Sequence, residues 1–310
     1  MRRGTQVILA GLAAAWCAAA AAGNLVTDVR TAIAQHNFTR GENELQAYRA
    51  RQGVTPEYVE ALSWLGRGAL AARSYDRADA YAAEARKLSL DLLKTRKLDA
   101  EPHLPLALGA SIEVQSQVLA ARGARDQAVV FLRQELARYG GTSIAMRIQK
   151  NINLLSLEGK AAPPLDLRQW LGTKPVPLAQ FKGRAVLLFF WAHWCGDCKG
   201  EVPVLAELMR QYGRRGLALI GPTQHYGYVQ GGEEATQERE TAYIDAVRRQ
   251  YYAPLGNMPA PVSEQNFKVY GCSTTPTLVL VDRNGIVRYY HPGAAPYEEL
   301  AARVAAGLGS

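Results

Sequence analysis

Cysteine and histidine are scarce in this chain of 310 residues. So small a number of cysteines excludes a small secreted domain held together by a framework of disulfides. The histidines lack the spacing of a zinc site, so we expect neither a structural metal nor a metal cofactor. The four cysteines are Cys17, Cys195, Cys198 and Cys272. Two of them form a CxxC pair, which indicates that the pair is kept for chemistry.

The sequence also lacks a block of basic residues, although its formal charge is +8. The positive excess is spread thinly, unlike the clustered charge that follows a phosphate backbone, so we expect no nucleic-acid partner. Apolar residues make up 48% and charged residues 21%, values that exclude a wholly disordered or fibrous chain. The length indicates about two domains.

Only one stretch is apolar enough to raise the question of a membrane. A basic head at Arg2 and Arg3 precedes an alanine-rich apolar run that ends in small residues at Ala22. This order predicts a signal peptide over residues 1–22 that is cleaved, and therefore a periplasmic or secreted protein. The run is short and weakly apolar for a bilayer span, so a retained membrane anchor is the minor alternative.

Residues 23–158 are predicted to form an all-helical domain. Apolar residues recur there at helical spacing, glycines separate the segments, and no strand pattern interrupts them. The expected helices are Leu25–His36, Asn43–Arg51, Pro56–Ala72, Tyr75–Lys97, Pro105–Arg122, Arg125–Tyr139 and Ser143–Leu157.

One part of this domain resembles a tetratricopeptide repeat. Leu65 and Gly66, followed by Tyr75, Ala78 and Ala85, have the repeat's spacing of large and small residues. A second match to the repeat pattern is weaker and does not lie one repeat length from the first. We therefore do not expect a regular array of tetratricopeptide repeats. Tetratricopeptide-like helical hairpins and an irregular helical bundle remain equal alternatives, and either can hold a protein partner.

The pattern changes at Gly159, and residues 159–310 are predicted to form a second domain. Strand-like apolar runs alternate there with helical segments, which predicts a mixed sheet with helices on both faces. The expected strands are Ala185–Ala192, Leu217–Gly221, Thr277–Asp282 and Ile286–Tyr290, and the expected helices are Glu201–Tyr212, Glu233–Tyr251 and Tyr297–Leu308.

The Cys195–Cys198 pair stands between the first of these strands and a helix. At a helix N-terminus, free N–H groups and the helix dipole favour a thiolate, by about 0.3–1 kcal/mol at an exposed site. The thiolate is the species that attacks a disulfide. Two intervening residues also place both sulfurs in one helical turn, where they can close a small disulfide. The context therefore indicates a redox dithiol.

Residues 160–308 resemble the TlpA/ResA branch of thioredoxin-like proteins, which are exported thiol-disulfide oxidoreductases. The motifs that carry the resemblance are Phe190–Cys198, Glu201–Pro203, Tyr270–Thr277 and Val281–Gly285. The resemblance implies a thioredoxin-like α/β fold with no bound cofactor. It also implies an enzyme that reduces disulfides of client proteins with electrons from a membrane-embedded thiol donor.

The same resemblance implies roles for three residues of the CxxC helix. Cys195 is the nucleophile, and Cys198 resolves the mixed disulfide. Glu201 corresponds to the family's acidic residue beneath the pair, which takes part in its proton transfers. A half-buried carboxylate near a thiol raises the pKa of that thiol and can move its proton. A solvated helix residue is the plainer alternative for Glu201.

Three further residues take roles from the resemblance. Pro276 corresponds to the family's cis-proline beside the active site. Thr275, just before it, offers its backbone to an extended substrate segment. Trp194 shields the pair and shapes the contact surface, with core packing as its alternative role.

Two residues depart from the family's pattern. Asp197 stands where many relatives carry proline, and its charge is expected to raise the pKa of the Cys195 thiol, unless the side chain caps the helix and points away. Cys272 replaces an aliphatic residue. We expect it to be a small buried apolar side chain, with a regulatory or intermolecular thiol as the alternative.

The surroundings of the pair are less defined by the sequence. We expect His193 to face outward, although a charged imidazole there would lower the pKa of Cys195. Residues 222–262 are longer than the same part of a minimal thioredoxin. Within them, His225–Tyr228 is expected either to lie in a loop near the pair or to be a plain connector.

Other functions compete with disulfide reduction. A thiol peroxidase would carry Thr or Ser at Ala192, three residues before the reactive cysteine, and a copper-handling relative would have three residues between its cysteines. The remaining alternative is a helical adaptor with an accessory or vestigial redox domain. The intact Cys195, Cys198 and Pro276 argue against vestigiality.

Overall fold

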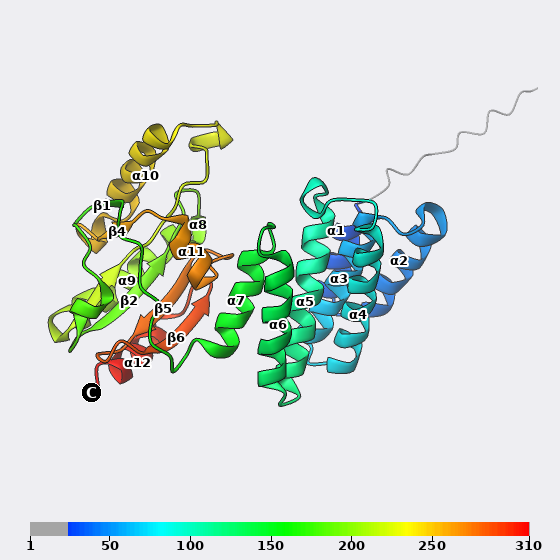
Figure 1. Cartoon of the computed structure of the whole chain (residues 1–310), viewed down its shortest axis with the longest axis horizontal. Helices are drawn as coiled ribbons and strands as arrows, with labels where there is room; N and C mark the ends of the chain where they lie inside the picture. The colour runs from blue at the N-terminus through cyan, green and yellow to red at the C-terminus, as the bar shows by residue number, and fades with distance from the viewer. Residues whose placement is uncertain (1–23, 310) are drawn as a thin grey trace, which may run out of the picture.

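The computed structural model describes residues 24–309, and the predicted signal peptide at residues 1–22 lies outside them. A helical part and an α/β part lie side by side along the longest axis of the molecule (Figure 1). The helical part consists of α1 (Leu25–Ala34), α2 (Phe38–Gln52), α3 (Pro56–Ala71), α4 (Tyr75–Leu92), α5 (His103–Ala121), α6 (Arg125–Tyr139) and α7 (Ala145–Ser156).

Helix α5 is the centre of the helical part, because α3, α4, α6 and α7 all pack against it. Helices α3 and α4 approach closely at small residues, where Gly66 faces the backbone of Ala78 and where Ala78 and Ala82 are buried. Helix α2 begins at Phe38, five residues before the predicted start, because the Asn37 side chain caps it by accepting the N–H of Arg40 at 3.0 Å.

The α/β part contains a four-stranded sheet in the order β3-β2-β5-β6. Strand β2 pairs in parallel with β3 and antiparallel with β5, and β5 pairs antiparallel with β6, so the predicted mixed sheet is confirmed. The strands are β2 (Ala185–Phe190), β3 (Leu217–Ile220), β5 (Thr277–Val281) and β6 (Val287–Pro292). The helices are α8 (Gly196–Gly200), α9 (Val202–Tyr212), α10 (Gln237–Tyr251), α11 (Glu264–Tyr270) and α12 (Tyr297–Gly307).

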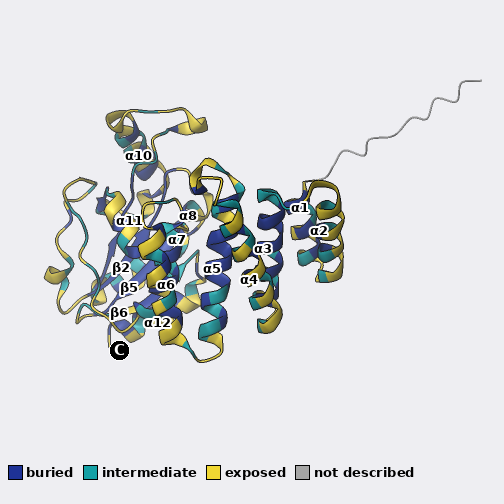
Figure 2. Ribbon diagram, turned by 45° about the vertical axis from the view of Figure 1, so that its right-hand side comes forward, coloured by how far each residue is buried: buried dark blue, intermediate teal, exposed yellow. Residues whose placement is uncertain are grey.

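Every residue of β2 is buried, and alternate residues feed two different cores. Leu187 and Phe189 pack in one core with residues of α9, α10 and α12. Leu188 and Phe190 pack in the other with residues of α11. Figure 2 shows β2 and β5 as buried strands between more exposed helices.

Two features of this part are absent from the sequence prediction. The first of these features is helix α11, because its seven residues are too few to show a clear helical period. The other is a two-stranded antiparallel sheet between β1 (Trp170–Leu171) and β4 (Ala260–Pro261). The pattern of two residues does not distinguish a strand from a loop.

The chain between the two parts is held against the edge of the sheet. The N–H of Gly159 donates to the carbonyl of Val287 at 2.8 Å, and the N–H of Val287 donates to that of Lys160 at 2.9 Å. The Glu158 carboxylate accepts the N–H of Tyr290 at 3.2 Å. The connection therefore covers part of the outer edge of β6.

Helix α7 packs directly on α11, which leads to the loop that contains Pro276. Asn153 donates to the carbonyl of Val269 at 3.2 Å, and Leu157 lies in the apolar core of the α11 face. Gly271 ends α11 with φ +61°, and a Cβ on it would lie only 2.7 Å from backbone atoms of Gln149 and Lys150. The contact therefore requires glycine.

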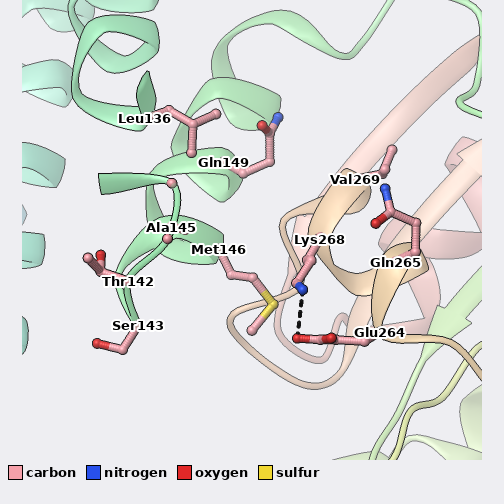
Figure 3. A pocket seen from close by; sticks show the side chains of 12 residues that line it. Leu136, Thr142, Ser143, Ala145, Met146, Gln149, Glu264, Gln265, Lys268 and Val269 are labelled. Atoms are coloured by element: carbon pink, nitrogen blue, oxygen red, sulfur yellow. Dashed lines mark ion pairs between the residues drawn. The ribbon is translucent and has the colours of Figure 1, made fainter. Parts of the chain in front are cut away.

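Beside this contact, a cleft of about 560 Å³ opens between the α6–α7 turn and α11. Figure 3 shows Met146 and Gln149 on one side of it and the Glu264–Lys268 ion pair on the other.

We expect Gly271→Ala to lower the free energy of unfolding by about 2–4 kcal/mol, because the left-handed backbone is strained for alanine and the new methyl group meets α7. Gly285→Ala is the control, since Gly285 has φ +82° with open space around its Cβ position, and it should cost only about 1–2 kcal/mol. Urea denaturation of both variants measures the difference. An equal decrease in the free energy of unfolding of the two variants would contradict a close contact at Gly271.

Candidate active site

The Cys195–Cys198 pair lies where β2 ends and α8 begins, as the sequence predicts. Buried Trp191 continues from β2, and its indole N–H donates to the carbonyl of Gly221 at 2.9 Å. Thr223 donates its hydroxyl to the carbonyl of Trp191 at 2.9 Å. The segment before the cysteines is therefore fixed to the chain that follows β3.

The two cysteines form a disulfide, with their Cα atoms 5.3 Å apart. Cys195 is the N-cap of α8, and its Sγ accepts the N–H of Cys198 at 3.0 Å. Cys198 is fully buried, whereas 3% of Cys195 is exposed. A sulfur at this position receives a backbone N–H and lies at the positive end of a short helix, and both favour a thiolate after reduction.

Glu201 is buried, with 4% of the residue exposed, so a fully solvated helix residue is excluded. It lies between α8 and α9, and its Oε1 accepts the N–H of Ala295 at 3.3 Å. Burial raises the pKa of this carboxyl, while the Ala295 N–H and nearby His291 act in the opposite direction. Ala295 belongs to the apolar core that also contains both cysteines.

The peptide bond between Thr275 and Pro276 is cis. Pro276 is buried, and its carbonyl accepts the N–H of Gly293 at 2.8 Å. Thr275 is half-buried, and its hydroxyl has no hydrogen-bond partner within residues 24–309. Its backbone N–H and carbonyl also form no hydrogen bond with another described residue.

Trp194 is half exposed, so the alternative of core packing is wrong. Its ring and the Tyr226 ring form a T-shaped pair with centroids 5.5 Å apart. Tyr226 belongs to the His225–Tyr228 segment, which therefore does lie beside the CxxC motif.

The expectation that His193 faces outward is wrong. Only 1% of His193 is exposed, and the rings of Tyr226, Tyr228 and Tyr243 surround it with centroids 5.3–5.5 Å away. Its Nε2 lies 3.4 Å from Oε1 of Glu240. Burial lowers the pKa of His193, and Glu240 opposes that shift. The partners come from α10 and the loop before it, which a local pattern at His193 does not reveal.

The two departures from the family pattern occupy different environments. Asp197 is exposed in the first turn of α8, and its side chain forms no hydrogen bond with any described residue, so the helix is capped by Cys195 and not by Asp197. Cys272 is buried in the apolar core of the α11 face, as expected for a small apolar side chain. Burial raises the pKa of its thiol well above the ordinary value.

Residues 24–309 contain neither a membrane-spanning helix nor a cluster of metal-binding side chains. No helix in this range is both long and apolar enough to cross a membrane. Nor do three His, Cys, Asp or Glu side chains in it gather as ligands for a metal ion.

Comparison with known proteins places this site in a family. The AhpC/TSA family model matches residues 159–290. The thiol-disulfide oxidoreductase ResA of Bacillus cereus is 30% identical over 146 residues, which are 46% of this chain and 73% of ResA. This chain belongs to the ResA family of thiol-disulfide oxidoreductases. The enzyme is thus a thiol-disulfide oxidoreductase with a thioredoxin-like fold.

Two further proteins are similar to this oxidoreductase. The thioredoxin-like protein YneN of Bacillus subtilis is 25% identical over 148 residues, 47% of this chain and 78% of YneN. The crystal structure of a thiol-disulfide isomerase from Corynebacterium glutamicum is 19% identical, with a TM-score of 0.40, and covers 49% of this chain and 97% of its own.

The raised pKa of Glu201 predicts a pH dependence of stability. The folded chain holds this proton at pH values where the unfolded chain, with a carboxyl pKa of about 4.3, has released it. The stability contributed by the carboxyl is therefore present at low pH and lost as the pH rises through the folded pKa. Glu201→Gln does not titrate, so it should become more stable relative to the native chain as the pH rises.

Urea denaturation of the oxidised protein at about pH 4 and about pH 8 measures this trend. Glu207→Gln is the control, because Arg210 lowers the pKa of partly exposed Glu207 and the trend should have the opposite sign. A difference between Glu201→Gln and the native chain that stays constant with pH would refute the assignment.

Proposed function

We propose that this oxidoreductase is exported and reduces disulfides of client proteins through a cycle at Cys195 and Cys198. The observation that carries the proposal is the disulfide at the start of α8, in which Sγ of Cys195 accepts a backbone N–H. The reduced pair is the reactive form, and the disulfide is the product of one turnover.

In the proposed cycle, the Cys195 thiolate attacks one sulfur of the client disulfide. A mixed disulfide forms, and the other client sulfur leaves as a thiolate that takes up a proton. The Cys198 thiolate then attacks Sγ of Cys195 and releases the second client thiol. The client gains two electrons and two protons, and the enzyme is left with the Cys195–Cys198 disulfide.

Glu201 is proposed to handle the proton of Cys198 during this cycle. It follows Cys198 by three residues, and burial raises the pKa of its carboxyl, which makes it a better proton acceptor from a thiol. Its link to Ala295 places it beside the core that contains both cysteines.

Thr275 and Trp194 are proposed to hold the client. The unpaired N–H and carbonyl of Thr275 suit a client segment that binds in an extended conformation beside cis Pro276. Half-exposed Trp194 supplies an apolar surface next to Cys195. Electrons for the next turnover would come from a membrane-embedded thiol donor.

The remaining proposals concern the rest of the chain. Residues 1–22 are proposed to be a cleaved export signal that delivers the enzyme to the periplasm or outside the cell, with a membrane anchor as the alternative. Residues 23–158 are proposed as a tetratricopeptide-like domain that binds a protein partner, and residues 159–310 as the redox domain.

The peroxidase and adaptor alternatives receive less support. Ala192 is fully buried and has no hydroxyl group to offer a peroxide. An adaptor would keep its biological role after Cys195→Ser, whereas an enzyme would lose it.

The two cysteine variants should differ in a characteristic way when insulin and dithiothreitol are supplied. Cys195→Ser should lower the rate of insulin reduction more than about 100-fold, because the attacking thiolate is gone. Cys198→Ser should accumulate a mixed disulfide with insulin at Cys195, which mass spectrometry without reductant detects.

Cys272→Ala is the matched control, and its rate should stay within about twofold, because Cys272 is a buried apolar side chain. A mixed disulfide trapped in Cys195→Ser instead would reverse the roles of the two cysteines. Undiminished insulin reduction by Cys195→Ser would overturn the proposed function.

A further inference from the structure

His193 and Glu240 form a buried ionisable pair. His193 precedes Trp194 in the chain, and Glu240 comes from the first turns of α10. Each residue is only 1% exposed, and 3.4 Å separates His193 Nε2 from Glu240 Oε1. A carboxylate this deeply buried costs stability unless several donors satisfy it, so its partners indicate what it does.

Glu240 uses one oxygen for each of two consecutive backbone groups. Oε1 accepts the N–H of Tyr226 at 2.5 Å, and Oε2 accepts the N–H of Gly227 at 2.9 Å. Gly227 has φ +85°, so the loop turns sharply where the carboxylate holds it. Glu240 therefore fixes the conformation of the His225–Tyr228 loop.

The loop in turn contacts the two residues that precede Cys195. The His193 ring meets Tyr226 and Tyr228 edge-on, with centroids 5.5 and 5.3 Å away. Tyr226 also meets Trp194 edge-on at 5.5 Å. A continuous set of contacts thus leads from Glu240, through the loop, to the exposed indole beside Cys195.

We infer that Glu240 and His193 are positioning residues of the enzyme: they lock the His225–Tyr228 loop and so fix Trp194 in the orientation that receives a protein client. This inference rests on the proposed role of Trp194 in client contact. In this inference the segment after β3 contributes to the recognition of clients. It takes no part in the redox chemistry. Neither residue of the pair needs to touch the reacting sulfurs.

Glu240→Gln tests the inference in the full chain. Glutamine has one carbonyl oxygen, so its NH₂ group would face one of the two loop N–H donors, and the loop should loosen. We expect the KM for insulin reduction to rise about tenfold, with kcat within about twofold. Reduction of a small aromatic disulfide and the equilibrium with glutathione should stay unchanged.

Hydrogen exchange gives a second measurement on the same variant. The amides of Tyr226 and Gly227 should exchange at least about tenfold faster in Glu240→Gln than in the native chain. Glu238→Gln is the matched control on the same helix, because Glu238 is exposed, and it should change neither the KM nor the exchange.

A double variant separates action through Trp194 from general damage to the fold. Trp194→Ala alone should raise the KM for insulin, and adding Glu240→Gln to it should have little further effect, because both changes remove the same contact. Fully additive effects would overturn the inference, as would faster exchange with an unchanged KM, or unchanged exchange in a folded Glu240→Gln protein.

His193→Gln provides the test if Glu240→Gln does not fold. It removes the imidazole between the tyrosines but leaves the Glu240 carboxylate, and it should raise the KM for insulin without changing small-disulfide reduction. An unchanged KM in that variant would also overturn the inference. Insulin reduction that survives Cys195→Ser would instead mark a failure of the proposed function itself.

Discussion

The burial of strand β2 on both faces is the constraint on which the rest of the α/β part depends. Its alternate residues belong to two separate cores, so the strand cannot shift by one residue without exchanging both sets of side chains. Trp191 and Thr223 extend this fixed register beyond the end of the strand. Cys195 therefore begins α8 at a position that the whole sheet determines.

Different kinds of interaction fix the segments that form the site. The CxxC helix follows β2 directly, and the cis-proline loop is held between α11 and β5. Glu201 reaches Ala295, just before α12. The loop before α10 is instead held by a buried carboxylate and aromatic edges. Hydrogen bonds to a buried carboxylate, together with ring contacts, thus fix the conformation of this loop.

Much of the fold could be predicted from sequence because its signals are local. The apolar run from Ala185, the CxxC spacing and the helical periods of residues 25–157 all depend on neighbouring residues. Helix α11 is harder to predict from the sequence, although the Ser263 side chain caps it by accepting the N–H of Gln265. A cap before seven residues is a weak signal beside a full helical period.

The environment of His193 could not be predicted in the same way. Its carboxylate partner lies 47 positions later in the chain, in a helix whose other charged residues are mostly exposed. The sequence around Glu240 does not distinguish a buried glutamate from its solvated neighbours. Likewise, the exposure of Trp194 depends on how the loop at Tyr226 folds back. Long-range contacts, and not local propensity, decide these positions.

The pairing of residues 158–160 with β6 has a consequence for an enzyme that handles polypeptides. An open sheet edge presents unpaired backbone groups that recruit any extended chain, which leads to aggregation. Here Gly159, Lys160 and the Glu158 carboxylate already occupy part of that edge. The connection between the two parts thus shields part of the sheet edge from the extended protein segments that a thiol-disulfide oxidoreductase meets.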